Sequence, residues 1–216
     1  MIRILLIAFI LIHSSTAKSS TKALAENGKE VILFSDGTWK YSKDSCNKVS
    51  WNTDLLEINS NRFKKLPGAT FLVKSNVFNV GVYMELSKWT FSSHKDNEKN
   101  PEYRFAMKDG DGYVLIITEK TEISLDNMRQ VALINAQITA VDAREICAEY
   151  RIVNDKKALC LKRQGTIRGI KFVYFGYYYS NTNGTIQLLG YTSEKLFDGI
   201  RNELENLLNG FVVIEK

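Results

Sequence analysis

The segment IKFVYFGYYYS, residues 170–180, decides the fold because it is apolar or aromatic on both sides of an extended strand. Successive side chains of a strand point to opposite faces of the sheet. A strand that is apolar on both faces must be covered on both faces, which predicts a position in the middle of its sheet. Gly176, inside this segment, predicts the close approach of another backbone or ring.

The sequence after this strand predicts a turn, a second strand and a helix. Asn183-Gly184 is turn chemistry, and TIQLLGY follows as the partner strand. Apolar residues then recur at helical spacing over about residues 193–209. The stripe consists of Leu196, Phe197, Ile200, Leu204, Leu207 and Leu208. Gly210 is expected to end the helix in the left-handed conformation, and FVVIE to add a closing strand.

The sequence before this strand predicts a hairpin with a defined register. In AREICAEYRIVNDKKALCLKR, residues 143–163, a two-residue turn at Asn154-Asp155 places apolar residues opposite one another on one face. The other face is expected to be wet. It would carry Glu145, Cys147, Glu149, Arg151, Cys160 and Lys162. Cys147 and Cys160 become diagonal neighbours at about 7–8 Å, so we predict that they are not bonded to each other.

A second helix and further strands complete the predicted domain, residues 61–216. Ser124 is expected to cap a helix with an apolar stripe at three-to-four spacing. That stripe consists of Leu125, Met128, Val131, Ile134 and Ile138. Residues 102–119 predict a hairpin that turns at DGDG, and residues 80–91 a strand with a tight end. Two helices and about seven strands predict a three-layer α/β/α sandwich with a mainly antiparallel sheet.

The first 60 residues predict a signal and a small hairpin. Residues 1–17 have a basic start, an apolar core and small residues before a cut, which is typical of a secretory signal peptide cleaved after Ala17. An uncleaved membrane anchor is the alternative, but a span needs about 20 apolar residues. Residues 18–60 predict a β-hairpin, VILFSDGTWKYS, and a linker. The chain is therefore expected to be secreted or periplasmic, with no membrane span after cleavage.

Two segments are informative together: VGVYMELSKW, and the strand, helix and strand of GTIQLLGYTSEKLFDGIRNELENLLNGF. In these segments the arrangement resembles the PsbP and Mog1-like domain family. Leu86 stands where the family pattern leads us to expect a proline before the tryptophan. The resemblance implies an antiparallel sheet between helices and a protein that works by binding. Separately, GKEVILFSDGTWKYS is similar to a segment near the start of secreted bacterial proteins of unassigned role.

Several chemistries lack support in the sequence. The formal net charge is +5, and the basic residues are spread out, which does not favour nucleic-acid binding. Cys46, Cys147, Cys160 and His94 lack paired ligand spacing, so no metal site is predicted. The spacing of KDGDG places Lys120 where a calcium loop needs a glutamate, and a hairpin turn explains it better. We expect no cofactor and no catalytic residue.

Three functions remain as hypotheses. The first is a non-enzymatic module that binds a protein or cell-envelope component through Trp39 and Tyr41, or through Glu149 and Arg151. The second is an enzyme with a carboxylate or single-histidine site near His94 and Asp109. The third is a small-molecule or lipid carrier that uses the tyrosine-rich strand, with Tyr177 and Tyr179 among its binding residues. For the hairpin residues Trp39 and Tyr41, a structural lid is the favoured interpretation, because an isolated hairpin needs to dock on something larger.

Overall fold

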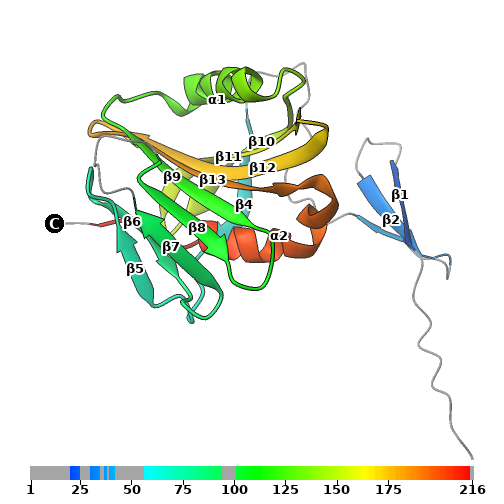
Figure 1. Cartoon of the computed structure of the whole chain (residues 1–216), viewed down its shortest axis with the longest axis horizontal. Helices are drawn as coiled ribbons and strands as arrows, with labels where there is room; N and C mark the ends of the chain where they lie inside the picture. The colour runs from blue at the N-terminus through cyan, green and yellow to red at the C-terminus, as the bar shows by residue number, and fades with distance from the viewer. Residues whose placement is uncertain are drawn as a thin grey trace, which may run out of the picture. The chain divides into compact units, whose positions relative to one another are not determined.

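The computed structural model describes residues 20–24, 30–34, 37, 39–41, 56–93 and 101–214 (Figure 1). The chain divides into two compact units, Met1–Ser45 and Cys46–Lys216. In the first unit, β1 (Ser20–Leu24), β2 (Glu30–Phe34) and β3 (Trp39–Tyr41) form an antiparallel sheet in the order β1-β2-β3. Leu33 pairs with Trp39, and Val31 with Tyr41.

The second unit contains an eight-stranded sheet in the order β4-β10-β11-β12-β13-β9-β8-β7. Its strands are β4 (Ile58–Phe63), β7 (Trp89–Ser93), β8 (Tyr103–Met107), β9 (Tyr113–Glu119), β10 (Arg144–Val153), β11 (Lys156–Ile167), β12 (Ile170–Asn181) and β13 (Gly184–Ser193). Only β4 and β10 pair in parallel, so the sheet is largely antiparallel. β12 lies in the interior of the sheet, as its apolar faces predict. β4 begins at Ile58, inside the segment that the sequence assigned to a linker.

A smaller sheet accompanies the main one. It has the order β14-β6-β5, from β5 (Phe71–Lys74), β6 (Val80–Met84) and β14 (Phe211–Val213). The expected single strand over residues 80–91 is therefore wrong. A turn after Met84 separates β6 from β7, and the two strands belong to different sheets.

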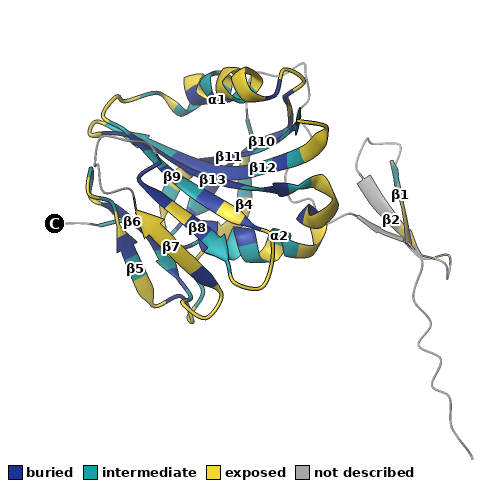
Figure 2. Cartoon of the chain, viewed as in Figure 1, coloured by how far each residue is buried: buried dark blue, intermediate teal, exposed yellow. Residues whose placement is uncertain are grey.

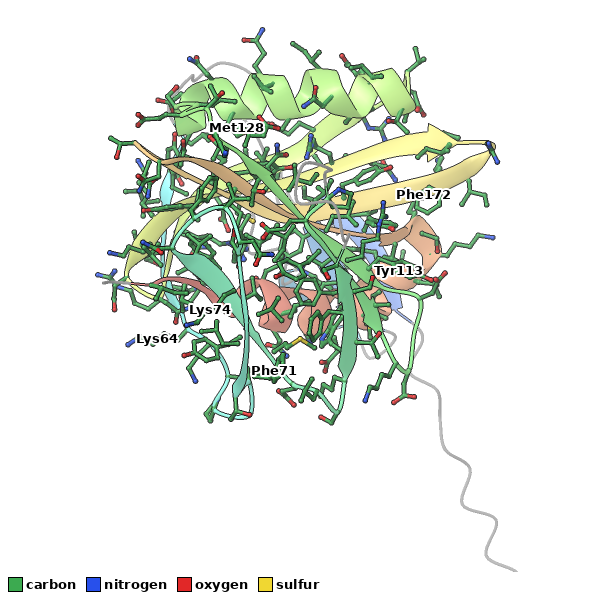
Figure 3. The ribbon with its side chains drawn as sticks, turned by 60° about the vertical axis from the view of Figure 1, so that its left-hand side comes forward. Lys64, Phe71, Lys74, Tyr113, Met128 and Phe172 are labelled. Atoms are coloured by element: carbon green, nitrogen blue, oxygen red, sulfur yellow. The ribbon has the colours of Figure 1, made fainter. Side chains whose placement is uncertain are left out.

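The two helices contact different residues of β12. α2 (Glu194–Leu208) packs on β12, β13 and β6, and its Leu204 belongs to the same apolar cluster as Tyr177. α1 (Leu125–Thr139) packs on β10, β11 and β12, and its Met128 belongs to a second cluster with Tyr178. Met128 lies on the side of α1 that faces the sheet (Figure 3). Neighbouring residues of a strand point to opposite faces, so Tyr177 and Tyr178 contact α2 and α1 from opposite sides of the sheet.

The predicted start of α1 is confirmed, but its predicted apolar stripe is partly wrong. Ser124 is the N-cap, and its side chain accepts a hydrogen bond from the backbone N–H of Asn127. The buried residues of α1 are Met128 and Ala132. Ile134 and Ile138, which the pattern placed in the core, are 51% and 78% exposed. Much of the surface of α1 is accordingly exposed (Figure 2).

The predicted end of α2 is also wrong in one respect. Asn209 caps the helix in the right-handed conformation, and Gly210 does not have a positive φ. Glycine is instead required at position 210 by a close approach, because a Cβ there would lie 2.0 Å from the carbonyl oxygen of Tyr83. The Tyr83 amide donates to the Gly210 carbonyl at 2.8 Å, which holds the chain against β6 as it enters β14.

The register predicted for the β10–β11 hairpin is confirmed. Tyr150 pairs with Leu159 and Glu149 with Cys160 across a turn in which Asn154 and Asp155 have φ of 45° and 66°. Cys147 is disulfide-bonded, while Cys160 is free and buried. The two cysteines are therefore not bonded to each other, as predicted.

A bulge changes the direction of one side chain in this hairpin. The register shifts between Glu145 and Cys147, so Glu145 pairs with Arg163 and shares its face of the sheet. Arg129 of α1 binds the Glu145 carboxylate there, with Nη2 to Oε1 at 2.7 Å. The expectation that Glu145 shares a face with Cys147 is wrong.

Candidate binding surface

Three predicted binding residues, Glu149 and Arg151 for a partner and Tyr177 for a ligand, meet in the interior. All three are fully buried. The expectation that this face of the hairpin is exposed to solvent is therefore wrong. α2 covers the face and supplies a second carboxylate, Glu205. These three side chains present no surface to a partner in the described part of the chain.

Arg151 is the centre of this buried cluster. Its Nε donates to Glu149 at 2.5 Å, and its Nη1 donates to the Tyr177 hydroxyl at 2.7 Å and to Glu205. The guanidinium carbon lies 4.2 Å from the centre of the Phe63 ring. Strands β10, β12 and β4 and helix α2 thus converge on one cation, and the arrangement fixes their relative positions.

Burial keeps the Tyr177 hydroxyl and the Cys160 thiol of this cluster protonated. Burial raises the pKa of Tyr177 well above its ordinary value, against the opposing effect of Arg151. Burial also raises the pKa of the Cys160 thiol to about 12. Burial by itself would lower the pKa of Arg151, but Cys160, Tyr177 and the carboxylates of Glu149 and Glu205 raise it. Arg151 opposes the effect of burial on the Cys160 thiol, but burial outweighs it, and a thiol that stays neutral is a poor nucleophile.

The other predicted site residues do not join this cluster. Tyr179 is half-buried, and its ring lies 5.3 Å from that of Phe211. Asp109 is exposed in the β8–β9 turn. The side chains of Trp39 and Tyr41, and all of His94, lie outside the described residues. Among the residues that the structure describes, no group of three or more histidine, cysteine, aspartate or glutamate side chains could hold a metal ion.

A surface that the sequence did not predict lies on the α1 side of the main sheet. α1 packs on β10, β11 and β12, and the same face continues over β13, β9 and β8. The register places six apolar side chains there, all half-buried or exposed. We call these residues the open face: Tyr113, Leu115 and Ile117 on β9, Leu189 and Tyr191 on β13, and Tyr174 on β12.

Three tyrosines form a row across the open face. Tyr174 pairs with Tyr191, and Tyr191 pairs with Tyr113, on three adjacent strands. The ring centres of Tyr113 and Tyr191 lie 5.3 Å apart and those of Tyr191 and Tyr174 6.3 Å apart. Tyr113 is 37% exposed. Tyr113 and Phe172 mark the end of the sheet at which this row lies (Figure 3).

One flank of α1 borders the open face. Each residue of an α-helix advances by about 100°, so Ile134 and Ile138 lie on the flank opposite Arg129. Arg129 reaches β10 through Glu145. The opposite flank is therefore turned toward β13, the strand that follows β12 in the sheet. We call Val131, Ile134 and Ile138 the α1 flank.

Two arginines lie on the α1 side of the sheet, one at the open face and one beneath α1, and a hydrogen bond to the Asp111 carboxylate raises the pKa of Tyr113 at the open face. Arg104 is exposed on β8 and pairs with Leu115. Arg163 is buried beneath α1, where it donates to the Tyr178 hydroxyl and to the carbonyl of Ala132. Its Nε has no hydrogen-bond partner among the described residues. No carboxylate within ion-pair distance of either guanidinium occurs in that part of the chain.

The sequence does not indicate the open face because apolar strand residues predict burial. Leu115, Ile117 and Leu189 alternate with core residues in strands that read as two-sided. Such a strand needs two covering layers, but α1 is too narrow to cover all eight strands. Ile134 and Ile138 are exposed for the same reason. The sequence signal of the open face is an apolar stripe on α1 that is too wide for the helix to bury.

No protein-family model matches the sequence, and a search of curated proteins finds none that is similar. In the part of the chain that is described, no helix is long and apolar enough to cross a membrane. The structure is similar to the solution structure of cyanobacterial PsbP, CyanoP, from Synechocystis sp. PCC 6803. The TM-score is 0.54 at 12% identity, over 68% of this chain and 93% of that chain.

Two further solved structures are similar at lower scores. One is a protein from Bacteroides thetaiotaomicron VPI-5482, with a TM-score of 0.46 and 13% identity over 70% of this chain and 50% of that chain. The other is a protein of unknown function from Pseudomonas aeruginosa, with a TM-score of 0.43 and 9% identity over 69% of this chain and 100% of that chain. The likeness to CyanoP is one of fold, and it agrees with the resemblance to PsbP that the sequence indicated.

Proposed function

We propose that this protein is a non-enzymatic accessory module of a secreted or periplasmic compartment, and that it binds a protein or cell-envelope component through the open face. The observation that carries the proposal is that the described elements cover the main sheet incompletely on the α1 side. Large exposed apolar patches on soluble domains are typical of interaction sites. In the open face and the α1 flank, Tyr113, Ile134 and Ile138 are exposed and the other apolar residues are half-buried.

In this proposal the molecule is a helix–sheet–helix sandwich in which one helical layer is incomplete. α2 and the small sheet supply Phe197, Leu204 and Phe211 to the core on the Tyr177 side. On the Tyr178 side, α1 buries only Met128 and Ala132 of its own residues. The completed side supports a stable scaffold, and the incomplete side leaves apolar area for a partner.

Photocrosslinking in the native host tests this proposal. A benzophenone amino acid replaces Tyr113 in the full chain, so that one aromatic side chain substitutes for another. The matched control replaces Phe91, which is 39% exposed where Tyr113 is 37% exposed, and which pairs with Phe105 of the opposite core. We expect a discrete adduct in the envelope or secreted fraction from position 113 and none from position 91.

The outcome that contradicts the proposal is equal labelling from both positions, or labelling from position 91 alone. Leu189→Glu in the Tyr113 photoprobe background should abolish the adduct, because it places a charge in the centre of the open face. Amino-terminal sequencing of the recovered protein tests the proposed compartment. The proposed signal cleavage predicts a mature chain that begins at Lys18.

A further inference from the structure

We infer that the open face binds an amphipathic helix of a partner protein, with acidic side chains of that helix beside Arg104. This inference rests on the proposed function and names the partner element. It commits to a helix because of the dimensions of the face and to a foreign chain because of the polarity of α1. It commits to acidic side chains because Arg104 is exposed at the border of the face.

The spacing of the elements fits one helix. Strands in a sheet lie about 4.8 Å apart, and packed helices lie about 8–10 Å apart. A helix beside α1 therefore lies about two strands away from the strands beneath α1. A helix at that distance would lie over β13 and β9, which carry five of the six residues of the open face. The new helix would complete the layer that α1 begins.

The apolar residues on two adjoining surfaces require a broad apolar stripe on the partner helix. Leu115 and Leu189 form a floor, since they pair with each other at the centre of the open face. Ile134 and Ile138 form a wall, because they lie on the flank of α1 that is turned toward β13. A helix that contacts both surfaces must be apolar over roughly a third of its circumference, as in ordinary helices that pack on a core.

A second copy of this chain does not fit the same face. If two copies paired through it, the outward side of one α1 would rest on the floor of the other copy. Gln130 and Gln137 lie on that outward side, about 180–200° from Met128 at 100° per residue. Both are exposed, and the Gln137 amide already donates to the Ala143 carbonyl at 3.1 Å. Burying the Gln130 amide against Leu115 and Leu189 without a partner is unfavourable. We therefore expect the chain to be monomeric through this face.

The charges select the polar residues of the partner helix. Arg104 is exposed at the border of the floor, and the Asp111 carboxylate lies beside Tyr113. Glu119, which lies further along β9, already accepts a hydrogen bond from Gln187 at 3.3 Å. Carboxylates on the partner helix would complement Arg104, whereas lysines would be repelled.

Binding of designed peptides to the mature chain tests the inference. The probe is a labelled amphipathic peptide of about 18 residues, or about five turns, with leucines on one face and glutamates elsewhere. One comparison peptide carries lysines in place of the glutamates, and another carries a central proline that breaks the helix. We expect the acidic peptide to bind at least about tenfold more tightly than either comparison peptide, measured by fluorescence anisotropy.

Substitutions in the chain locate the binding. Ile138→Glu should weaken binding of the acidic peptide by about tenfold or more, because it puts a carboxylate on the wall. The matched control, Gln130→Glu, adds the same charge on the outward side of the same helix and should leave binding unchanged. Arg104→Glu should reverse the preference between the acidic and the lysine peptide.

Three outcomes overturn the inference: equal binding of the proline peptide, binding unaffected by Ile138→Glu, or no binding of the acidic peptide. Sedimentation analysis supplies a fourth, a dimer that Ile138→Glu converts to monomer, which would give the face to a second copy. These results are separable from failure of the proposed function. If position 113 crosslinks to a partner while the acidic peptide does not bind, the helix inference fails and the binding module stands.

Discussion

Arg151 shows how a single charged residue can be misread from a strand pattern. The alternation of side chains along β10 assigns each residue to one of two faces of the sheet. It does not show whether the face with charged residues is exposed to solvent. The deciding partner, Glu205, is 54 residues away on α2. A salt bridge between segments so distant in sequence leaves no local signal, so burial of Glu149 and Arg151 was not predictable from residues 143–163.

Removal of Arg151 should destabilise the protein strongly. Arg151→Met leaves Glu149 and Glu205 without their shared cation, and unpaired buried charges cost about 3–5 kcal/mol of unfolding free energy. The triple variant Arg151→Met, Glu149→Gln, Glu205→Gln removes the charges together and should recover part of the loss. Urea unfolding measures both. A single variant as stable as the parent would show that the cluster does not hold α2 on the sheet.

Tyr150 should contribute a pH dependence at the alkaline end. Burial and a hydrogen bond donated to Asp126 raise its pKa to about 12, from about 10 in the unfolded chain. The folded state therefore binds this proton more tightly, and the stability it confers is complete below about pH 10 and lost as pH rises toward 12. Tyr150→Phe should flatten the fall in melting temperature between those values, and an unchanged slope would contradict this account.

Cys160 should be unreactive in the folded protein. Its thiol is fully buried and its pKa is raised to about 12 by burial, so little thiolate forms near neutral pH. We expect iodoacetamide to label Cys160 only in denaturant, as read by mass spectrometry of the intact and unfolded chain. Rapid labelling under native conditions would mean that the β10–β12 interior opens readily.

At the scale of elements, turn chemistry was the most predictive part of the sequence. Asn154-Asp155 fixed a two-residue turn, and with it the register that places Cys160 opposite Glu149. The bulge beside Cys147 was not predictable, because the strand residues around it carry no glycine and no turn signal. The break between β6 and β7 was missed because Glu85–Lys88 lacks glycine and proline.

Two glycines at the end of the chain offer a matched test of packing. A Cβ on Gly210 would lie 2.0 Å from a backbone oxygen of β6, whereas a Cβ on Gly199, within α2, would meet nothing within 4 Å. Gly210→Ala should therefore destabilise the protein by about 1–3 kcal/mol. Gly199→Ala should stabilise it by about 0.5–1 kcal/mol, because alanine favours helix interiors. Thermal unfolding of both variants gives the comparison.

At the scale of the whole molecule, the two-sided strand at residues 170–180 was sufficient to predict a sheet with β12 inside it. A two-sided strand predicts two complete covering layers, but it indicates neither the second small sheet nor the open face. Which strands a helix covers depends on its crossing position, and no single segment encodes that position. The candidate binding surface was therefore visible only once the strands were assembled.

The unequal anchoring of the helices should appear in hydrogen exchange. α2 buries Phe197, Leu204, Leu207 and Leu208, whereas α1 buries Met128 and Ala132. Local opening follows the apolar contacts that an element makes. We expect amide protons of α1 to exchange at a lower opening free energy than those of α2 or β12. Equal protection of the two helices would indicate that other segments support α1.

The free thiol of Cys160 also constrains how the chain matures. The Cys160 thiol is kept from the disulfide at Cys147 only after β10, β11, β12 and α2 have packed around the thiol. Before closure, that sulfur can attack the existing bond and shuffle it. Correct oxidation therefore depends on docking of the carboxy-terminal helix, and refolding with α2 destabilised should accumulate mispaired isomers.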